Sequence, residues 1–418
     1  MSVLGIVAEY NPLHKGHAWH IRKSLEETGA EAAVCVLSSQ FVQRGEPALV
    51  NKTARTLMAL QNGIDLVVEL PCAFSCASAE YFASAAVGIL HSLGVVTTLS
   101  FGSEEGTLEV LSRTADVLIE EPHEYKAALK GFLDEGLSFP AARQRALESY
   151  LPPESLDAVA SPNNILAIEY LKALKRLKSP IQPITIPRVG QGYNESQIGA
   201  DFSSATAIRN FLRSTGKNGA NYFPDSDELS RNMPGTSIAI LTSEMEAGRG
   251  PVFPEAFDNI LLYLLRTSPG SSLTALPFME EGLHNRLKKA AMEEDSLEGV
   301  VKSCTTGRYP SSRVKRILCS LLLGMTDAFL GELKDNGYAQ YIRVLGFNEK
   351  GRRLLARARK RADLPILVKP SHYKRMENPL ARRLFEYEIK ATDIYTMAYS
   401  HPAIKKGGQE LTTPVVML

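Results

Sequence analysis

The chain has 418 residues, too many for one small hydrophobic core, and this length suggests two or three domains. Hydrophobic residues make up 44% of the chain and charged residues 22%, as is ordinary for a globular protein in water. The formal net charge of +1 excludes a global electrostatic signature of nucleic-acid binding, so any basic surface must be local.

The sequence has no evident targeting or membrane segment. The first apolar run, SVLGIVA, lacks a basic leader and a cleavage site, and no stretch approaches the ~20 apolar residues that span a bilayer. The five cysteines are odd in number and scattered, which argues against a disulfide framework and favours buried thiols in a reducing compartment. We therefore expect a cytoplasmic protein with no membrane partner.

Short apolar runs alternate with helical patterns over the first two hundred residues. The patterns predict strands at 3–9, 32–39, 65–71, 97–104 and 183–190, and helices at 16–28, 50–63, 78–94 and 167–178. Strands that are apolar on both faces and alternate with helices form a parallel sheet covered on both sides. The sequence thus predicts a doubly wound, Rossmann-like α/β domain over residues 1–218, with a helical insertion around 107–178.

Helical spacing dominates the remainder of the chain. Helices are predicted at 257–266, 282–294, 311–325 and 350–362, and a strand only at 363–370. We therefore predict a mainly α-helical domain over residues 219–418. Its segment KGRRLLARARKR (350–361) carries seven basic residues in twelve, so it either binds RNA phosphates or packs through Leu354 and Leu355 and exposes a solvated basic face.

Three of the eight histidines stand within seven residues, HKGHAWH, directly after the first predicted strand. In a doubly wound sheet ligands bind at the carboxyl ends of the strands, and the free N–H groups at a helix start favour an anion. Gly16 removes a side chain, so a phosphate can approach the backbone. No fourth ligand stands at a spacing suitable for zinc. These features indicate a triphosphate site at His14, Gly16 and His17, with His20 one turn further along and outside it.

A second strand-to-helix entry lies in FSSATAIRNFLRSTG (202–216). Ser203 or Ser204 can cap this helix, and Gly216 can end it. Elsewhere Arg44, Lys52 and Arg55 either bind a substrate anion or belong to a solvated helix face.

The two segments have a known parallel. NPLHKGHAWH resembles the HxGH signature of the nucleotidyltransferase superfamily, shared with class I aminoacyl-tRNA synthetases, and FSSATAIR resembles its partner motif, about 190 residues further on. The ordered pair is more specific than either motif alone. The resemblance implies phosphate and transition-state contacts from His14 and His17, close approach of the nucleotide at Gly16, and β- and γ-phosphate contacts from Ser204, Thr206 and Arg209.

A narrower resemblance spans nearly the whole chain. GIVAEYNPLHKGH, SSQFVQRGEPALVNKTAR, SPNNILAIEYL and LGFNEKGRRLL together resemble the bacterial tRNA(Met) cytidine acetate ligase family. This implies that ATP activates acetate as acetyl-adenylate, and that the acetyl group passes to N4 of the wobble cytidine of elongator tRNA(Met). It also implies nucleotide contacts from Val7, Gly102, Asn163 and Arg188. On this hypothesis the helical domain holds the tRNA by phosphate contacts, and Mg²⁺ assists by neutralising the triphosphate, although no acidic metal motif stands out in the sequence.

One alternative activity fits the same motif pair. A small-molecule adenylyltransferase that makes a dinucleotide-type cofactor would use both motifs, but it needs little beyond the α/β domain. It would leave about 200 C-terminal residues, including the basic segment, without a task. Nothing in the sequence specifies an oligomeric state.

Overall fold

The computed structural model describes residues 1–104, 107–137, 139–152, 155–156, 161–187, 203–217, 227–280 and 282–418. Its central sheet has the strand order β10-β8-β5-β2-β1-β6-β7, with β9 paired to β8. Five neighbouring strands run parallel, as the sequence predicts: β1 (Val3–Ala8), β2 (Ala32–Ser38), β5 (Leu66–Leu70), β6 (Thr98–Ser103) and β7 (Gln182–Pro187). From β1 the chain winds outward through β2 and β5 in one direction and through β6 and β7 in the other. The order therefore reverses beside β1.

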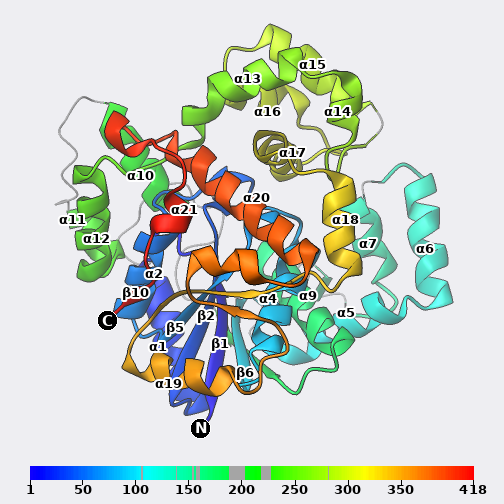
Figure 1. The fold of residues 1–418 in the computed structure, drawn as a ribbon. Coiled ribbons are helices and arrows are strands. Elements are labelled where there is room, and N and C mark those ends of the chain that lie inside the picture. The colour runs from blue at the N-terminus through cyan, green and yellow to red at the C-terminus, as the bar shows by residue number, and fades with distance from the viewer. Residues whose placement is uncertain are drawn as a thin grey trace.

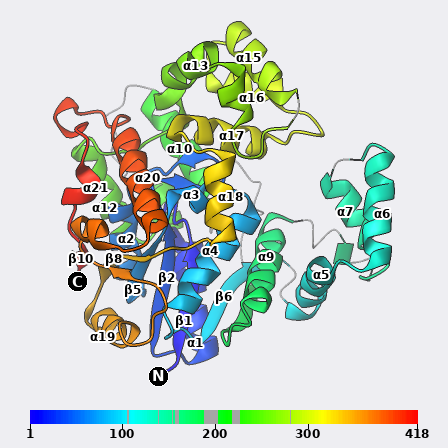
Figure 2. The same cartoon turned by 45° about the vertical axis from the view of Figure 1, so that its right-hand side comes forward.

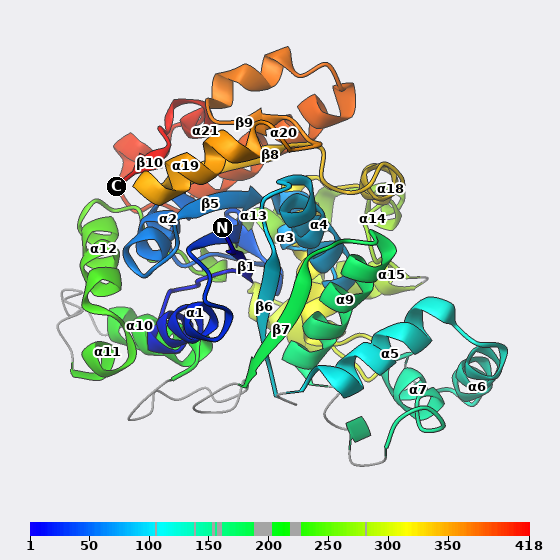
Figure 3. The same cartoon turned by 90° about the horizontal axis from the view of Figure 1, so that it is seen from below.

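Helices cover both faces of this sheet (Figure 3). Alternate residues of a strand point to opposite faces, so Val34 and Val36 join one hydrophobic cluster while Ala33 and Cys35 join the other. Helices of the second cluster are α1 (Lys15–Thr28), α2 (Lys52–Gln61), α10 (Ala205–Lys217), α11 (Asp227–Asn232) and α12 (Gly235–Glu246). The opposite face carries α3 (Cys72–Ser75), α4 (Ala79–Ser92) and α9 (Pro162–Arg176). The doubly wound prediction is thus confirmed.

The region of the predicted insertion contains two kinds of helix. α9 packs on α4 and β6 and is the crossover helix between β6 and β7. By contrast α5 (Leu108–Glu120), α6 (His123–Asp134) and α7 (Phe139–Ala146) extend away from the sheet, with α6 and α7 side by side (Figure 2). The projecting part is therefore shorter than the segment 107–178.

The C-terminal half is mainly helical, as expected (Figure 1). Its helices are α13 (Asp258–Thr267), α14 (Gly270–Thr274), α15 (Leu283–Glu293), α16 (Leu297–Cys304), α17 (Ser311–Leu323), α18 (Asp327–Asp335), α19 (Glu349–Ala358), α20 (Pro379–Thr396) and α21 (Gln409–Thr412). Short 3₁₀ turns occupy Pro254–Phe257, Pro370–Arg375 and Pro402–Ile404.

Two strands of this half, β8 and β10, were not predicted, whereas β9 lies within the predicted strand 363–370. β8 (Ile342–Phe347) pairs antiparallel with β5, and the short strands β9 (Ile366–Leu367) and β10 (Val416–Met417) pair with β8. A six-residue run such as IRVLGF cannot be distinguished from a buried helix segment by its period alone, and its partner lies about 280 positions away. The C-terminal half thus completes the sheet of the N-terminal half, while a boundary near residue 218 stays a prediction.

Two smaller expectations concern buried residues and membranes. All five cysteines are buried and unpaired, which confirms the prediction that they pack in the core. Among the residues that the structure describes, no helix has the length and apolar character to cross a bilayer.

Candidate active site

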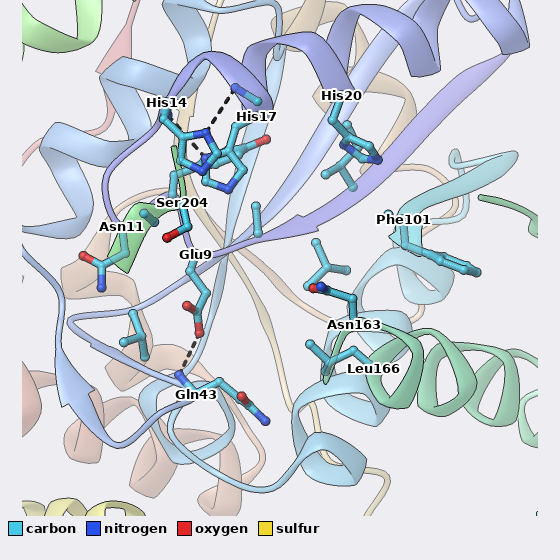
Figure 4. Close-up of a pocket in the computed structure, with 18 of the residues that line it drawn as sticks. Glu9, Asn11, His14, His17, His20, Gln43, Phe101, Asn163, Leu166 and Ser204 are labelled. Atoms are coloured by element: carbon cyan, nitrogen blue, oxygen red, sulfur yellow. Dashed lines mark hydrogen bonds between the residues drawn. The ribbon is translucent and has the colours of Figure 1, made fainter. Parts of the chain in front are cut away.

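A pocket of about 250 Å³ opens at the carboxyl ends of β1, β6 and β7 (Figure 4). It lies where the strand order reverses beside β1, the position at which doubly wound sheets bind ligands. The beginnings of α1 and α10 form a further part of its wall. Two helix N-termini, each with a positive partial charge, therefore face one cavity.

Nine of the ten residues that the sequence singles out line this pocket. They are Val7, His14, Gly16, His17, Gly102, Asn163, Ser204, Thr206 and Arg209. The tenth, Arg188, lies outside the residues that the structure describes. Folding thus brings the HKGH and SSATAIR segments to one cavity, although their contacts with a nucleotide stay predictions.

His14 and His17 form a stacked pair at the start of α1. Their ring centroids are 3.7 Å apart. His14 Nδ1 accepts the backbone N–H of Gly16 at 3.1 Å, and His17 Nδ1 accepts the backbone N–H of His14 at 3.4 Å. A ring nitrogen that accepts an N–H carries no proton, so each neutral imidazole holds its proton on Nε2. The helix start thereby sets both rings in one tautomer, with an N–H donor on the other ring nitrogen.

The start of α10 supplies the second motif. Ser204 caps the helix, since its Oγ accepts the backbone N–H of Ala207 at 3.1 Å, while Ser203 is buried and donates its backbone N–H to Asn232. The guanidinium of Arg209 donates to the carbonyl of Asn11 at 2.7 Å and to the hydroxyl of Thr206 at 3.2 Å. Arg209 therefore ties α10 to the turn that precedes the histidine pair.

The opposite side of the pocket is more apolar. Phe101, Asn163 and Leu166 lie there together, away from His14 and Ser204 (Figure 4). The amide of Asn163 donates to the carboxylate of Glu104. His20 was expected to lie outside the site, but it lines the same cavity one turn beyond His17, with its ring nitrogen Nε2 3.2 Å from the hydroxyl of Ser100. An apolar wall with an oriented amide is suited to a nucleoside.

Glu9 is a pocket residue that sequence reasoning missed. It follows β1 directly, and one carboxylate oxygen accepts the backbone N–H of Gln43 at 2.8 Å. Burial raises the pKa of Glu9, although Arg209, Arg44 and Arg55 act in the opposite direction. Glu9 could have been identified from the sequence as a charged residue directly after an otherwise apolar strand, because ligands bind at the carboxyl ends of such strands.

The basic residues that were ambiguous in sequence separate in the structure. Arg44 lines the pocket. Lys52 and Arg55 are buried, so neither belongs to a solvated helix face. Arg55 donates to the backbone carbonyls of Glu9, Ser38, Ser39 and Val50, and Lys52 pairs with carboxylates. Both side chains are thus engaged inside the protein.

The described part of the chain contains no group of three or more histidine, cysteine, aspartate or glutamate side chains arranged to hold a metal ion. The histidine pair instead takes its hydrogen bonds from the helix backbone.

The basic segment lies at the amino ends of the strands, on the opposite side of the sheet from the pocket at their carboxyl ends. α19 packs through Leu354 and Leu355, which are buried, while Arg352, Arg353 and Arg359 are exposed. Its N-cap residue Asn348 bonds to Asp65, the residue before β5, and α19 therefore adjoins the amino ends of the strands (Figure 1). The pocket lies at the carboxyl ends, so this basic face is not part of the pocket wall.

The fold and pocket define a doubly wound α/β protein whose ligand-binding cavity is faced by two helix N-termini. The chain matches the HIGH Nucleotidyl Transferase family over residues 1–410. It is 45% identical to a tRNA(Met) cytidine acetate ligase of Acetivibrio thermocellus over the full length of both chains. It is 43% identical to one of Caldanaerobacter subterraneus, over 97% of this chain and 98% of that one.

Solved structures agree with this assignment. Thermotoga maritima TmcAL is 34% identical in its apo form and superposes with a TM-score of 0.94 over all of both chains. The same protein bound with alpha-thio ATP has a TM-score of 0.91, again over all of both chains, at 35% identity. The chain therefore belongs to the tRNA(Met) cytidine acetate ligase family within the HIGH nucleotidyl transferases.

Proposed function

We propose that the chain is an ATP-dependent ligase that activates acetate as acetyl-adenylate, releases pyrophosphate, and transfers the acetyl group to N4 of the wobble cytidine of elongator tRNA(Met). The observation that carries this proposal is the meeting of the HKGH and SSATAIR segments in one pocket, in a chain similar over its full length to tRNA(Met) cytidine acetate ligases. A small-molecule adenylyltransferase would leave that full-length similarity unexplained.

In this proposal the histidine side of the pocket holds the triphosphate. The Nε2–H groups of His14 and His17 donate to oxygens at the α-phosphorus, where negative charge grows as acetate attacks. Ser204, Thr206 and Arg209 contact the β- and γ-phosphates from the start of α10. The alignment of acetate and α-phosphorus supplies most of the rate, because attack at phosphorus needs little covalent help.

In this proposal the nucleoside occupies the apolar side of the pocket, opposite the histidine pair. Phe101 and Leu166 offer an apolar surface to adenine, and Asn163 has both a donor and an acceptor for a base or ribose edge. Gly102 and Gly16 let the nucleotide approach the backbone, and Val7 also lines the cavity.

Acetate and Mg²⁺ complete the first step. Acetate is a small anion that needs a cationic wall, and Arg44 and Arg209 are arginines of the described pocket lining. When bound, Mg²⁺ neutralises charge on the triphosphate, whose own oxygens supply most of its ligands. We further propose that residues 219–418 hold the tRNA and that the reaction takes place in the cytoplasm, where tRNA is used.

The test is an incubation with ATP and labelled acetate, with and without tRNA(Met). We expect acetyl-AMP and acetate-dependent pyrophosphate release without tRNA, and label on the anticodon cytidine with tRNA. Absence of acetate-dependent pyrophosphate release would overturn the ligase proposal. Label that reaches AMP and never RNA would overturn the acceptor assignment.

A further inference from the structure

Glu9 is a carboxylate beside a phosphate site, and the proposed activation step gives it no task. A negative charge near the triphosphate is unfavourable, since like charges repel most strongly where water is excluded. Yet the protein holds Glu9 firmly in place. Its side chain accepts the N–H of Gln43 at 2.8 Å, and its backbone carbonyl accepts the guanidinium of Arg55 at 2.8 Å.

The position of Glu9 in the pocket suggests which substrate it meets. It lies below Ser204 and next to Gln43, apart from the nucleoside side with Phe101 and Asn163 (Figure 4). Gln43 belongs to the hairpin of β3 (Phe41–Val42) and β4 (Glu46–Pro47). The carboxylate side of the pocket is therefore the side walled by this hairpin.

That hairpin connects the pocket to the helical C-terminal region. Glu46 pairs with Lys315 of α17 at 2.6 Å. Gly45 lies so close to α17 that a Cβ there would come within 2.5 Å of the backbone nitrogen of Arg316. A macromolecule held by the helical region would thus reach the cavity along the hairpin, past Gln43 and Arg44, and would meet Glu9 there.

The second step of the reaction needs a base. The N4 amine of the cytidine attacks the acetyl carbonyl, a C–N bond forms, the C–O bond to AMP breaks, and N4 must lose one proton to become an amide. A carboxylate within hydrogen-bond reach can take that proton and later release it to water. The step then balances as acetyl-adenylate plus cytidine giving N4-acetylcytidine, AMP and a proton.

We propose that Glu9 is the catalytic residue that accepts the N4 proton of the acceptor cytidine during acetyl transfer. This inference rests on the proposed function and deepens it, because it assigns the second half-reaction to a residue that the first does not need. The raised pKa of Glu9, caused by burial and opposed by three arginines, makes its carboxylate a stronger base than an exposed one. Tyr170 of α9, which also lines the pocket, interacts electrostatically with this carboxylate.

Glu9→Gln separates the two half-reactions, and its amide oxygen can still accept the N–H of Gln43. Acetate-dependent pyrophosphate release without tRNA should not fall below that of wild type, because the first step does not need Glu9 and loss of its negative charge does not weaken binding of the triphosphate. Single-turnover transfer from preformed acetyl-AMP to tRNA(Met) should fall by about 10²-fold, a typical contribution of a positioned base. Glu9→Asp keeps a carboxylate one methylene further back and should transfer faster than Glu9→Gln. Glu26→Gln, an exposed carboxylate of α1, is the matched control.

The pH dependence of single-turnover transfer distinguishes a catalytic role of Glu9 from a merely structural one, which would leave that dependence unchanged. In wild type, single-turnover transfer should rise with pH as Glu9 loses its proton, and in Glu9→Gln that acidic limb should be missing. The other ionisable groups near Glu9 are the same in both proteins, so a difference between the two pH profiles is due to the Glu9 carboxylate. These groups are His14, His17, Arg44, Arg55, Arg209 and Tyr170. Equal rates of transfer by wild type and Glu9→Gln would overturn the inference. A loss of pyrophosphate release in Glu9→Gln as large as its loss of transfer would also overturn it, because that is the result expected if Glu9 were a Mg²⁺ ligand. Failure of wild type to acetylate tRNA would instead overturn the proposed function.

Discussion

Two charged clusters of this protein differ in how they use their charges. The pocket holds His14, His17 and Arg209, each of which makes a hydrogen bond with a backbone group and lines an open cavity. The lysine cluster, made of Lys52, Glu69, Glu388 and Glu410, is closed. Its four side chains are at most 5% exposed, and Lys52 Nζ lies 2.6 Å from Glu410, 3.5 Å from Glu388 and in contact with Glu69.

The difference shows what burial does to charge. One ammonium cannot balance three carboxylates, so burial and mutual repulsion raise the pKa of Glu388 to about 8, and that of Glu410 also rises. Glu388 in turn accepts the backbone N–H of Cys72 at 2.7 Å. The lysine cluster joins α2 and β5 to α20 and α21, and thus the two halves of the chain. A closed cluster stabilises a packing arrangement, whereas an open one can bind a substrate.

The largest expected effect comes from breaking the lysine cluster. Lys52→Ala leaves three carboxylates buried without a cation, and loss of one partner from a buried ion pair typically costs about 3–5 kcal/mol. We expect a loss of that size in the free energy of unfolding, measured by urea titration with circular dichroism. Lys23→Ala, in an exposed pair with Glu27, should change it by less than about 0.5 kcal/mol. Equal stability of the two variants would contradict the role given to the cluster.

The next largest effect is expected from a substitution in the pocket, and it should change activity and leave stability nearly unchanged. His17→Ala removes one donor from the proposed α-phosphate site and should slow acetate-dependent pyrophosphate release by about 10²-fold or more. The urea midpoint should stay near that of wild type, because His17 lines a cavity. His123→Ala, an exposed histidine of α6, is the control. Unchanged pyrophosphate release in His17→Ala would remove the histidine pair from the mechanism.

A third prediction concerns pH. The folded pKa of Glu388 lies above its unfolded value, so the native state binds the extra proton. Its contribution to stability is complete below about pH 4.5 and is lost as the pH rises towards 8. From pH 5 to 8 the free energy of unfolding should therefore fall by on the order of 2 kcal/mol more in wild type than in Glu388→Gln. Glu386→Gln, exposed on the same helix, should behave as wild type.

The smallest effect is expected on α19, remote from both clusters. If its exposed face contacts tRNA phosphates, replacing Arg353 and Arg359 with glutamine should weaken tRNA binding several-fold and lower the slope of log K against log salt by about 2. Acetyl-AMP formation should not change, since α19 lies at the other edge of the sheet. The measurement is filter binding across salt concentrations, with Arg22→Gln as the control. An unchanged slope would assign α19 to a solvated face.

Much of this protein follows from local sequence. A helix from residue 15 to 28 that ends at Gly29, with φ of 57°, is determined by periodicity and by a glycine that accepts a left-handed backbone. The parallel strands follow from β-branched runs that are apolar on both faces. The HKGH segment could be placed at a ligand-binding edge because any strand-to-helix turn in such a sheet lies there.

The tertiary structure decided what depends on distant partners. Local sequence could not show that Lys52 and Arg55 are buried, because their partners, such as Glu388 and the carbonyl of Glu9, lie at other positions of the chain. The same holds for β8, whose pairing partner β5 lies about 280 positions away, and for α19, whose basic face points away from the pocket. Periodicity reports the face that a segment buries, while the charges that surround a side chain are set by segments that only folding brings together.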